Sequence, residues 1–162
     1  MKRIVSILAV VALAAITGTG ALVWWLSRGH GPQYPQISAY SNGQLTRVGP
    51  YQYCQVLDLD ACMISAETGE LQVNSRHPVQ LSVPERIARA PWVLKLAYED
   101  SPVPQATLIG PNTRMTATIP TVDPHHGRLL GIAVQLLTLV RDADGDELPF
   151  PHAEWSVRTN WD

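Results

Sequence analysis

The two cysteines of the chain, Cys54 and Cys62, are the residues whose spacing most clearly limits their chemistry. Thiol redox centres usually place two cysteines two residues apart near a helix N-terminus, whereas seven residues separate this pair. In an oxidising compartment a lone close pair most simply forms a disulfide. Closing so short a loop stabilises a fold by about 2.5 kcal/mol. We therefore predict a structural disulfide, with a redox pair as the alternative.

A second group with metal-binding potential is the acidic cluster Asp142, Asp144, Asp146 and Glu147 around Gly145. Calcium takes several oxygen ligands, and this segment resembles part of a calcium loop. The glycine does not occupy the sixth position of an EF-hand loop, however, and the downstream glutamate is missing. Because Asp-Gly also suits the steric demands of a tight turn, the sequence favours a turn over a weak cation site.

The adjacent histidines His125 and His126, with Asp123 nearby, are the other candidate metal ligands. Neighbouring residues of an extended chain point in opposite directions, so such a pair rarely binds one ion. No second cysteine or histidine motif with zinc spacing is present in the sequence. We predict a solvated loop here, and neither a metal site nor a cofactor.

Patterns for nucleophilic catalysis and phosphate binding are absent from the sequence. It contains no Gly-x-Ser-x-Gly motif and no glycine-rich phosphate loop, and a disulfide would leave no free thiol. Three of the 12 basic residues precede position 29, whereas all 14 acidic residues follow it. This distribution argues against nucleic acid and against a polybasic patch for lipid headgroups. We predict a protein that is not an enzyme.

The segment closed by the two cysteines contains more apolar side chains than a solvated loop requires. Val56, Leu57 and Leu59 lie within it, and Tyr51 and Tyr53 precede it. A constrained loop with aromatic and aliphatic anchors is typical of a pre-organised protein-binding surface. The alternative interpretation is that these side chains cap the core of the domain.

An uncharged run over residues 4–26 follows Lys2 and Arg3. As a helix, its 23 residues span roughly 34 Å, more than a hydrocarbon core of about 30 Å. The basic start predicts a cytoplasmic N-terminus, and Trp24 and Trp25 suit the headgroup interface at the far end. We predict an uncleaved, single-pass signal anchor in the cell membrane. A cleaved signal peptide, which would release a secreted domain, is the alternative, and both place the remaining chain outside the cytoplasm.

The rest of the sequence predicts one domain of short strands. We expect residues 1–3 to form a cytoplasmic stub, 4–26 the transmembrane segment, 27–36 a linker with Pro and Gly, and 37–162 the exported domain. Asn42-Gly43 between two alternating runs indicates a hairpin. Apolar residues alternate or occupy both faces in further predicted strands at 79–83, 92–98, 115–119, 129–140 and 155–159. The pattern favours an all-β, immunoglobulin-like sandwich, although these cysteines are too close in sequence to bridge two sheets.

Several segments carry a family resemblance. They are the basic-led hydrophobic run, Tyr34-Pro-Gln-Ile-Ser-Ala-Tyr40, Arg47-Val-Gly-Pro-Tyr51 before Cys54, Val79-Gln-Leu-Ser-Val-Pro84 and Ile87-Ala-Arg-Ala-Pro-Trp92. Together they resemble a family of actinobacterial (mycobacterial and corynebacterial) exported, membrane-anchored proteins of unknown function. The resemblance implies a cell-envelope location and an exported β domain, and it transfers no catalytic residue.

These observations favour an accessory protein of the cell envelope whose β domain docks on another envelope or membrane protein, such as a transporter. The anchor would hold the domain near that partner. The alternative is a carrier that binds a lipid or a glycan between the sheets, lined by residues 129–140 with Trp92 and Trp155. An enzyme is the third hypothesis.

Overall fold

The structure is a computed structural model, and it describes residues 2–28, 34–142 and 144–161. Within the N-terminal helix, side chains are described at position 12 and at positions 15–27. The chain divides into two compact units, Met1–Gln33 and Tyr34–Asp162.

The first unit is the helix α1, Lys2–Arg28. Two of its hydroxyl groups bond within the helix, because Thr19 donates to the carbonyl oxygen of Ala15 at 2.8 Å and Ser27 donates to that of Val23 at 2.7 Å. Trp24 and Trp25 are exposed.

Within the described residues, no helix is long and apolar enough to cross a membrane. This differs from the predicted transmembrane segment over 4–26. Part of that prediction, positions 4–11, 13 and 14, lies outside the described side chains.

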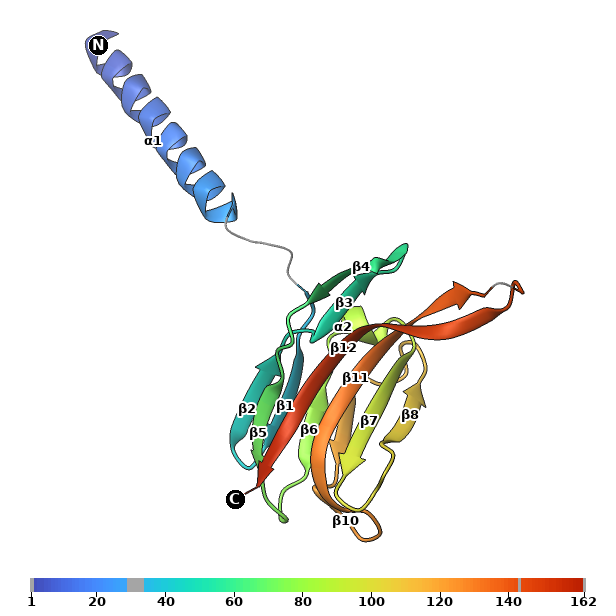
Figure 1. Cartoon of the computed structure of the whole chain (residues 1–162). Coiled ribbons are helices and arrows are strands. Elements are labelled where there is room, and N and C mark those ends of the chain that lie inside the picture. The colour runs from blue at the N-terminus through green and yellow to red at the C-terminus, as the bar shows by residue number, and fades with distance from the viewer. Residues whose placement is uncertain (1, 29–33, 143, 162) are drawn as a thin grey trace. The chain divides into compact units, whose positions relative to one another are not determined.

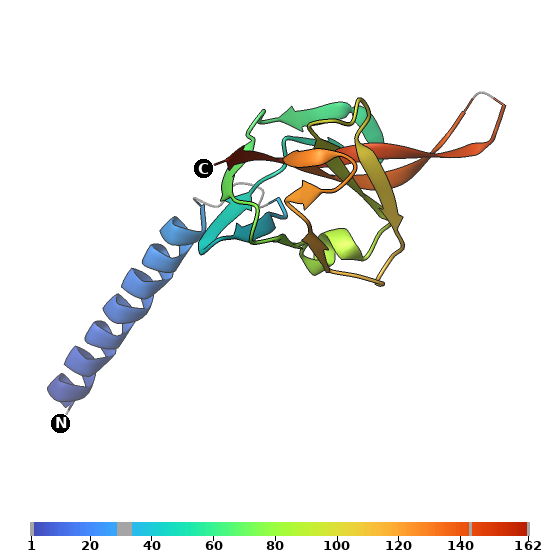
Figure 2. The same ribbon diagram turned by 90° about the horizontal axis from the view of Figure 1, so that it is seen from below.

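The second unit is a sandwich of two β-sheets, seen as two layers in Figures 1 and 2. The smaller sheet has the strand order β2 (Gln44–Val48), β1 (Ile37–Ser41), β6 (Val79–Ser82) and β9 (Thr116–Ile119). The larger sheet has the order β4 (Asp58–Ile64), β3 (Gln52–Gln55), β12 (Glu147–Trp161), β11 (Gly127–Arg141), β7 (Trp92–Tyr98) and β8 (Gln105–Ile109). Two further strands, β5 (Gly69–Val73) and β10 (Val122–Asp123), pair with β12 and β11, and a single helical turn, α2 (Glu85–Ala88), precedes β7.

The hairpin predicted at Asn42-Gly43 is present and joins β1 to β2. Both turn residues have positive φ angles, 48° and 80°, which a two-residue hairpin turn requires and which Asn and Gly tolerate best. Ser41 pairs directly with Gln44 across the turn. The local sequence therefore sets the register of this pair of strands.

The core lies between the two sheets and is built from the alternating positions of each strand. In the larger sheet, Leu94, Val134 and Trp155 face inward side by side across β7, β11 and β12. Trp92 and Trp155 are both 0% exposed and belong to one continuous hydrophobic cluster with the smaller sheet. The long apolar run at 129–140 lies in β11, which is a central strand of the larger sheet, as its two apolar faces predicted, although the last residues of the run extend beyond β7.

The part of the predicted linker that the structure describes, residues 34–36, packs on the sandwich. The carbonyl oxygen of Pro35 accepts a hydrogen bond from the indole of Trp155 at 2.8 Å, and the ring of Tyr34 lies 4.9 Å from that of Tyr53. These contacts fix the beginning of the domain against its core.

Candidate functional site

The disulfide predicted between Cys54 and Cys62 is present, with an S–S distance of 1.99 Å. The two residues lie directly opposite each other on β3 and β4. The segment between them was expected to be a loop, but it is the end of a hairpin, because β3 extends to Gln55 and β4 begins at Asp58. We call residues 52–64 the disulfide hairpin. The bond joins neighbouring strands of one sheet and leaves the two sheets unlinked to each other.

The residues of the predicted binding surface divide between the tip and the base of the disulfide hairpin. Leu57 and Val56 form the tip and are 100% and 53% exposed, and Leu59 is half-buried. Tyr51 lies at the base, where its backbone N–H donates to the carbonyl oxygen of Glu154 at 2.7 Å.

Tyr53 belongs to the interior face of the base. Its ring lies 4.9 Å from that of Tyr34, 5.7 Å from that of His152 and 6.4 Å from that of Trp155. This arrangement matches the alternative in which such residues cap the core, so of the predicted surface residues Val56 and Leu57 at the tip are the most exposed, and Ile64 at the base is a further exposed apolar residue of the hairpin.

A larger exposed feature, which the sequence reasoning did not identify, is the outer half of the β11–β12 hairpin. Figure 1 shows the two strands leaving the sheet as a separate ribbon. On one side β7 begins at Trp92, which pairs with Leu136, and on the other side β3 pairs with β12 at Ala153 and Glu154. Residues 138–142 and 144–150 therefore extend beyond both neighbouring strands, and we call them the arm.

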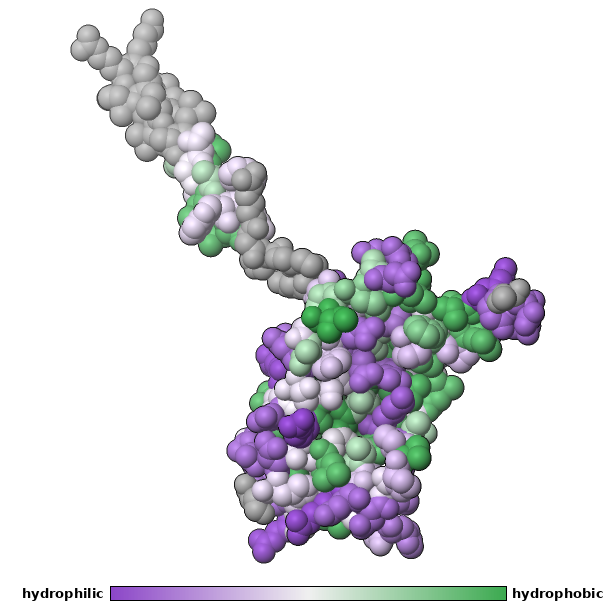
Figure 3. All heavy atoms as spheres, in the orientation of Figure 1, coloured by the Kyte–Doolittle hydropathy of each residue, from purple (hydrophilic) through white to green (hydrophobic). Residues whose placement is uncertain are grey.

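The arm has apolar side chains on both of its faces. Leu139 pairs with Pro149 on one face, and Val140 pairs with Leu148 on the other. Leu139, Leu148 and Phe150 are 64%, 49% and 45% exposed. Figure 3 shows hydrophobic residues along this projection, with hydrophilic residues at its end. An isolated two-stranded ribbon has no core of its own in which to bury such residues.

The acidic cluster forms the turn at the tip of the arm, as predicted. One carboxylate oxygen of Asp142 accepts hydrogen bonds from the backbone N–H groups of Asp144 at 3.0 Å and Asp146 at 2.9 Å. Gly145 has a φ of +91°, which the turn requires and which glycine adopts without strain. Arg141 and Glu147 close the turn with a 3.1 Å ion pair. Among the residues that the structure describes, no three His, Cys, Asp or Glu side chains are grouped so as to hold a metal ion.

Asp123 organises the histidine loop at the opposite end of β11. Its carboxylate accepts hydrogen bonds from the backbone N–H groups of His125 at 2.9 Å and His126 at 3.0 Å, and it lies 2.8 Å from Nδ1 of His126. These hydrogen bonds, with the backbone of His125 first, hold the pKa of Asp123 below its usual value. Burial, and secondarily the charge of Asp123, raise the pKa of Tyr98, whose hydroxyl donates to the carbonyl oxygen of Pro120 at 3.1 Å.

The family model described as "Protein of unknown function (DUF2771)" matches residues 30–160. The chain belongs to this family. The DUF2771 match includes the disulfide hairpin and the arm. The chain is also 58% identical over 159 residues to uncharacterised proteins of Mycobacterium tuberculosis and Mycobacterium bovis, an alignment that covers 98% of this chain and 98% of each relative. No solved structure matches the chain. The predicted resemblance to mycobacterial proteins of unknown function is thus confirmed.

Proposed function

We propose that this DUF2771 chain is a non-enzymatic accessory protein of the cell envelope whose β-sandwich docks on another envelope protein, such as a membrane transporter, through the arm. The observation that carries the proposal is the exposure of Leu139, Leu148 and Phe150 on a ribbon that has no sheet neighbours. Full burial of each such side chain in an interface is worth about 1.5–3 kcal/mol. Exposed apolar residues gathered in one place are typical of protein-binding surfaces.

The β12 edge of the arm is unsuited to strand addition, so we expect a partner to contact it through side chains. Pro149 lies on this strand of the arm and Pro151 follows the arm on the same strand, and proline has no N–H with which to extend a sheet. The tip adds Asp142, Asp144 and Asp146 beside the apolar residues. A partner with an apolar groove bordered by basic residues complements this surface, because opposite charges at the rim speed association and fix the orientation of the complex.

The disulfide hairpin extends the same binding surface. Its tip carries Val56 and Leu57, and its base is joined to the base of the arm because Nδ1 of His152 lies 3.2 Å from the carbonyl oxygen of Cys54. The disulfide holds the strands that bear this tip, so less conformational entropy is lost on binding.

The location that we propose is the outer face of the cell membrane, with α1 as an uncleaved anchor and the N-terminus in the cytoplasm. The basic start, the uncharged run at 4–26 and the exit tryptophans support an anchor, and the disulfide supports an oxidising compartment. We also propose that the sandwich is immunoglobulin-like. The alternative is a secreted domain released by signal cleavage. Mass spectrometry of the mature N-terminus distinguishes the two, because cleavage would remove the residues of α1.

Site-specific photo-crosslinking in native membranes tests the docking proposal. A photoreactive amino acid at Leu139 or Phe150 is expected to give the same discrete adduct, and mass spectrometry is expected to identify an envelope protein in it. The matched control is Leu108, which is as exposed as Leu139 (65% and 64%) but lies on the edge strand β8. Leu148→Glu is expected to abolish the adduct. No adduct at the arm, or identical adducts at all three positions, would contradict the proposal.

The alternative of a carrier for a lipid or a glycan between the sheets has less support. The two tryptophans expected to line such a cleft, Trp92 and Trp155, fill the core.

A further inference from the structure

A hollow of about 460 Å³ lies at one end of the smaller sheet, and neither the arm nor the disulfide hairpin contributes to it. Six residues line it: Tyr40, Asn42, Gly43, His77, Pro78 and Gln80. Its volume falls within the range of about 300–1,000 Å³ typical of small-molecule sites. We call it the tyrosine hollow. None of its lining residues carries an acidic, lysine or arginine side chain.

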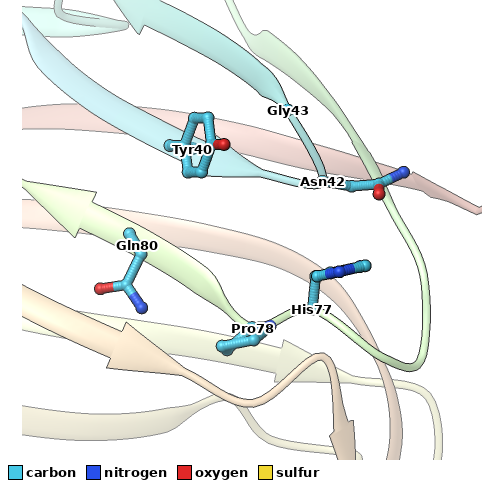
Figure 4. Close-up of a pocket in the computed structure, with 6 residues that line it drawn as sticks. All are labelled: Tyr40, Asn42, Gly43, His77, Pro78 and Gln80. Atoms are coloured by element: carbon cyan, nitrogen blue, oxygen red, sulfur yellow. The ribbon is translucent and has the colours of Figure 1, made fainter.

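The tyrosine hollow lies on the solvent-facing side of the smaller sheet. The strand register places Leu45, Tyr40, Gln80 and Thr118 in one row across β2, β1, β6 and β9. The side chain of Tyr40 is 46% exposed, although it has a neighbour in this row on each side, Leu45 and Gln80. In Figure 4 its ring stands on β1 beside the side chain of Gln80 on β6, and none of the other labelled side chains covers it. One face of an aromatic ring is therefore available to a ligand.

His77 is oriented so that its outer ring nitrogen is a hydrogen-bond acceptor when the ring is neutral. Oδ1 of Asn74 accepts the backbone N–H groups of Arg76 and His77, both at 3.0 Å, and this pattern identifies the atom as the carboxamide oxygen. Nδ1 of His77 lies 3.0 Å from the same oxygen, so Nδ1 carries the proton. The lone pair of neutral His77 is then on Nε2, which does not take part in this contact.

The turn that carries His77 is held by hydrogen bonds from β1 and from the segment between β9 and β10. The hydroxyl of Ser41 donates to the carbonyl oxygen of His77 at 3.2 Å, and the hydroxyl of Thr121 donates to that of Asn74 at 2.8 Å. Ser41 and Thr121 are both buried. The position of the imidazole is thus fixed before any ligand arrives, which lowers the entropic cost of binding.

Gln80 supplies the complementary donor. The hydroxyl of Thr118 donates to Oε1 of Gln80 at 3.0 Å, which orients the amide and directs its NH₂ group away from that contact. Within the described residues, this is the contact that the Gln80 side chain makes. The tyrosine hollow therefore combines an aromatic face, a fixed acceptor at His77 and an oriented donor at Gln80.

We infer that the tyrosine hollow binds a neutral sugar residue of a glycan. A sugar ring has an apolar C–H face that packs on an aromatic ring, and its hydroxyl groups both donate and accept hydrogen bonds. The uncharged lining disfavours phosphates, carboxylates and ammonium groups, since no opposite charge is present to compensate their desolvation. A protein segment would require a larger apolar contact than one exposed tyrosine provides.

The test is an NMR titration of the ¹⁵N-labelled full-length protein in a detergent without a sugar headgroup. The probes are cellohexaose, maltohexaose, mannohexaose and xylohexaose, each raised to about 20 mM because an open site of this size is expected to bind with a dissociation constant of about 1 mM. We expect at least one probe to shift the amide signals of residues 40–43 and 77–80. Tyr40→Ala is expected to weaken that binding about 10-fold, and Gln80→Ala about 3-fold or more.

The matched control is Tyr51→Ala, which removes another partly exposed tyrosine of the sandwich and should leave the affinity unchanged. Tyr40→Phe keeps the aromatic face and should retain most of the affinity, and the amide spectrum of Tyr40→Ala outside residues 40–43 and 77–80 should match that of the unchanged protein, which separates a lost contact from a folding defect. If none of the four probes moves these signals, or if binding is insensitive to Tyr40→Ala, the inference is overturned.

Discussion

Trp92 and Trp155 form a matched pair on which the energetics of the core can be tested. Both side chains are fully buried, and both lie on strands that flank β11. Their indole N–H groups differ. That of Trp155 donates a 2.8 Å hydrogen bond to the carbonyl oxygen of Pro35, whereas that of Trp92 is buried and meets no acceptor in the described part of the chain. One tryptophan is therefore fully satisfied, and the other is not.

Replacing each tryptophan by phenylalanine separates packing from hydrogen bonding. Both substitutions remove the same atoms, at a packing cost of about 2 kcal/mol. Trp155→Phe also removes a hydrogen bond worth about 1 kcal/mol. Trp92→Phe removes a buried unsatisfied donor, whose presence costs about 1–3 kcal/mol. We expect Trp155→Phe to lower the free energy of unfolding by about 3 kcal/mol, and Trp92→Phe by about 1 kcal/mol or less.

Urea unfolding of the full chain, followed by far-UV circular dichroism, measures the difference. With a slope of about 1.5 kcal/mol per molar urea, a gap of about 2 kcal/mol separates the two midpoints by more than about 1 M. Trp161→Phe is the control, because this half-buried indole donates to the carbonyl oxygen of Leu129 at 2.9 Å and should give an intermediate loss. Equal midpoints for the two buried variants, or a lower midpoint for Trp92→Phe, would refute the reasoning.

Three further predictions concern the disulfide, one glycine and one carboxylate. Replacing Cys54 and Cys62 together by serine should lower the free energy of unfolding by about 2.5 kcal/mol, and an unchanged urea midpoint would contradict this. Gly69→Ala should cost about 1–3 kcal/mol, because its Cβ would lie 2.2 Å from a valine methyl group on β2, whereas Gly49→Ala, with its nearest atom at 4.0 Å, should be close to neutral in the same assay. The carboxylate of Asp123 should titrate below 3.8 by ¹³C NMR, since its folded-state pKa is lowered. Its stabilising effect is then present above the unfolded-state pKa and is lost as the pH falls through the folded-state pKa, and a midpoint at or above 3.8 would contradict the assignment.

Features that depend on neighbouring residues were predictable from the sequence. Asn42-Gly43 specifies its own turn, because these two residues tolerate the positive φ angles that the turn requires. The disulfide followed from the small separation of Cys54 and Cys62. The strand at 129–140 followed from its apolar character on both faces.

Features that depend on where distant strands end were not predictable in this way. The exposure of the arm is set by β7, which begins at Trp92 directly after Pro91 and so leaves residues 138–141 of β11 paired with β12 alone. The apolar pattern of β11 is the same inside and outside the sheet. One usable signal was length, since the apolar run at 129–140 is longer than the predicted strand at 92–98 beside which it lies. The aromatic ring of Tyr53 gave no comparable signal, because a tyrosine suits a core and a surface equally well.

The two proposed binding regions are carried by different sheets, and this separation makes their independence testable. The arm belongs to β11 and β12 of the larger sheet, whereas Tyr40 and Gln80 belong to β1 and β6 of the smaller one. Substitutions at distant sites without shared partners usually act additively. Leu148→Glu should therefore abolish the crosslink at the arm and leave sugar binding unchanged, and Tyr40→Ala should do the reverse. A loss of both readouts in either variant would indicate that one surface serves both purposes, and the assignment of protein docking to the arm and of sugar binding to the tyrosine hollow would then be wrong.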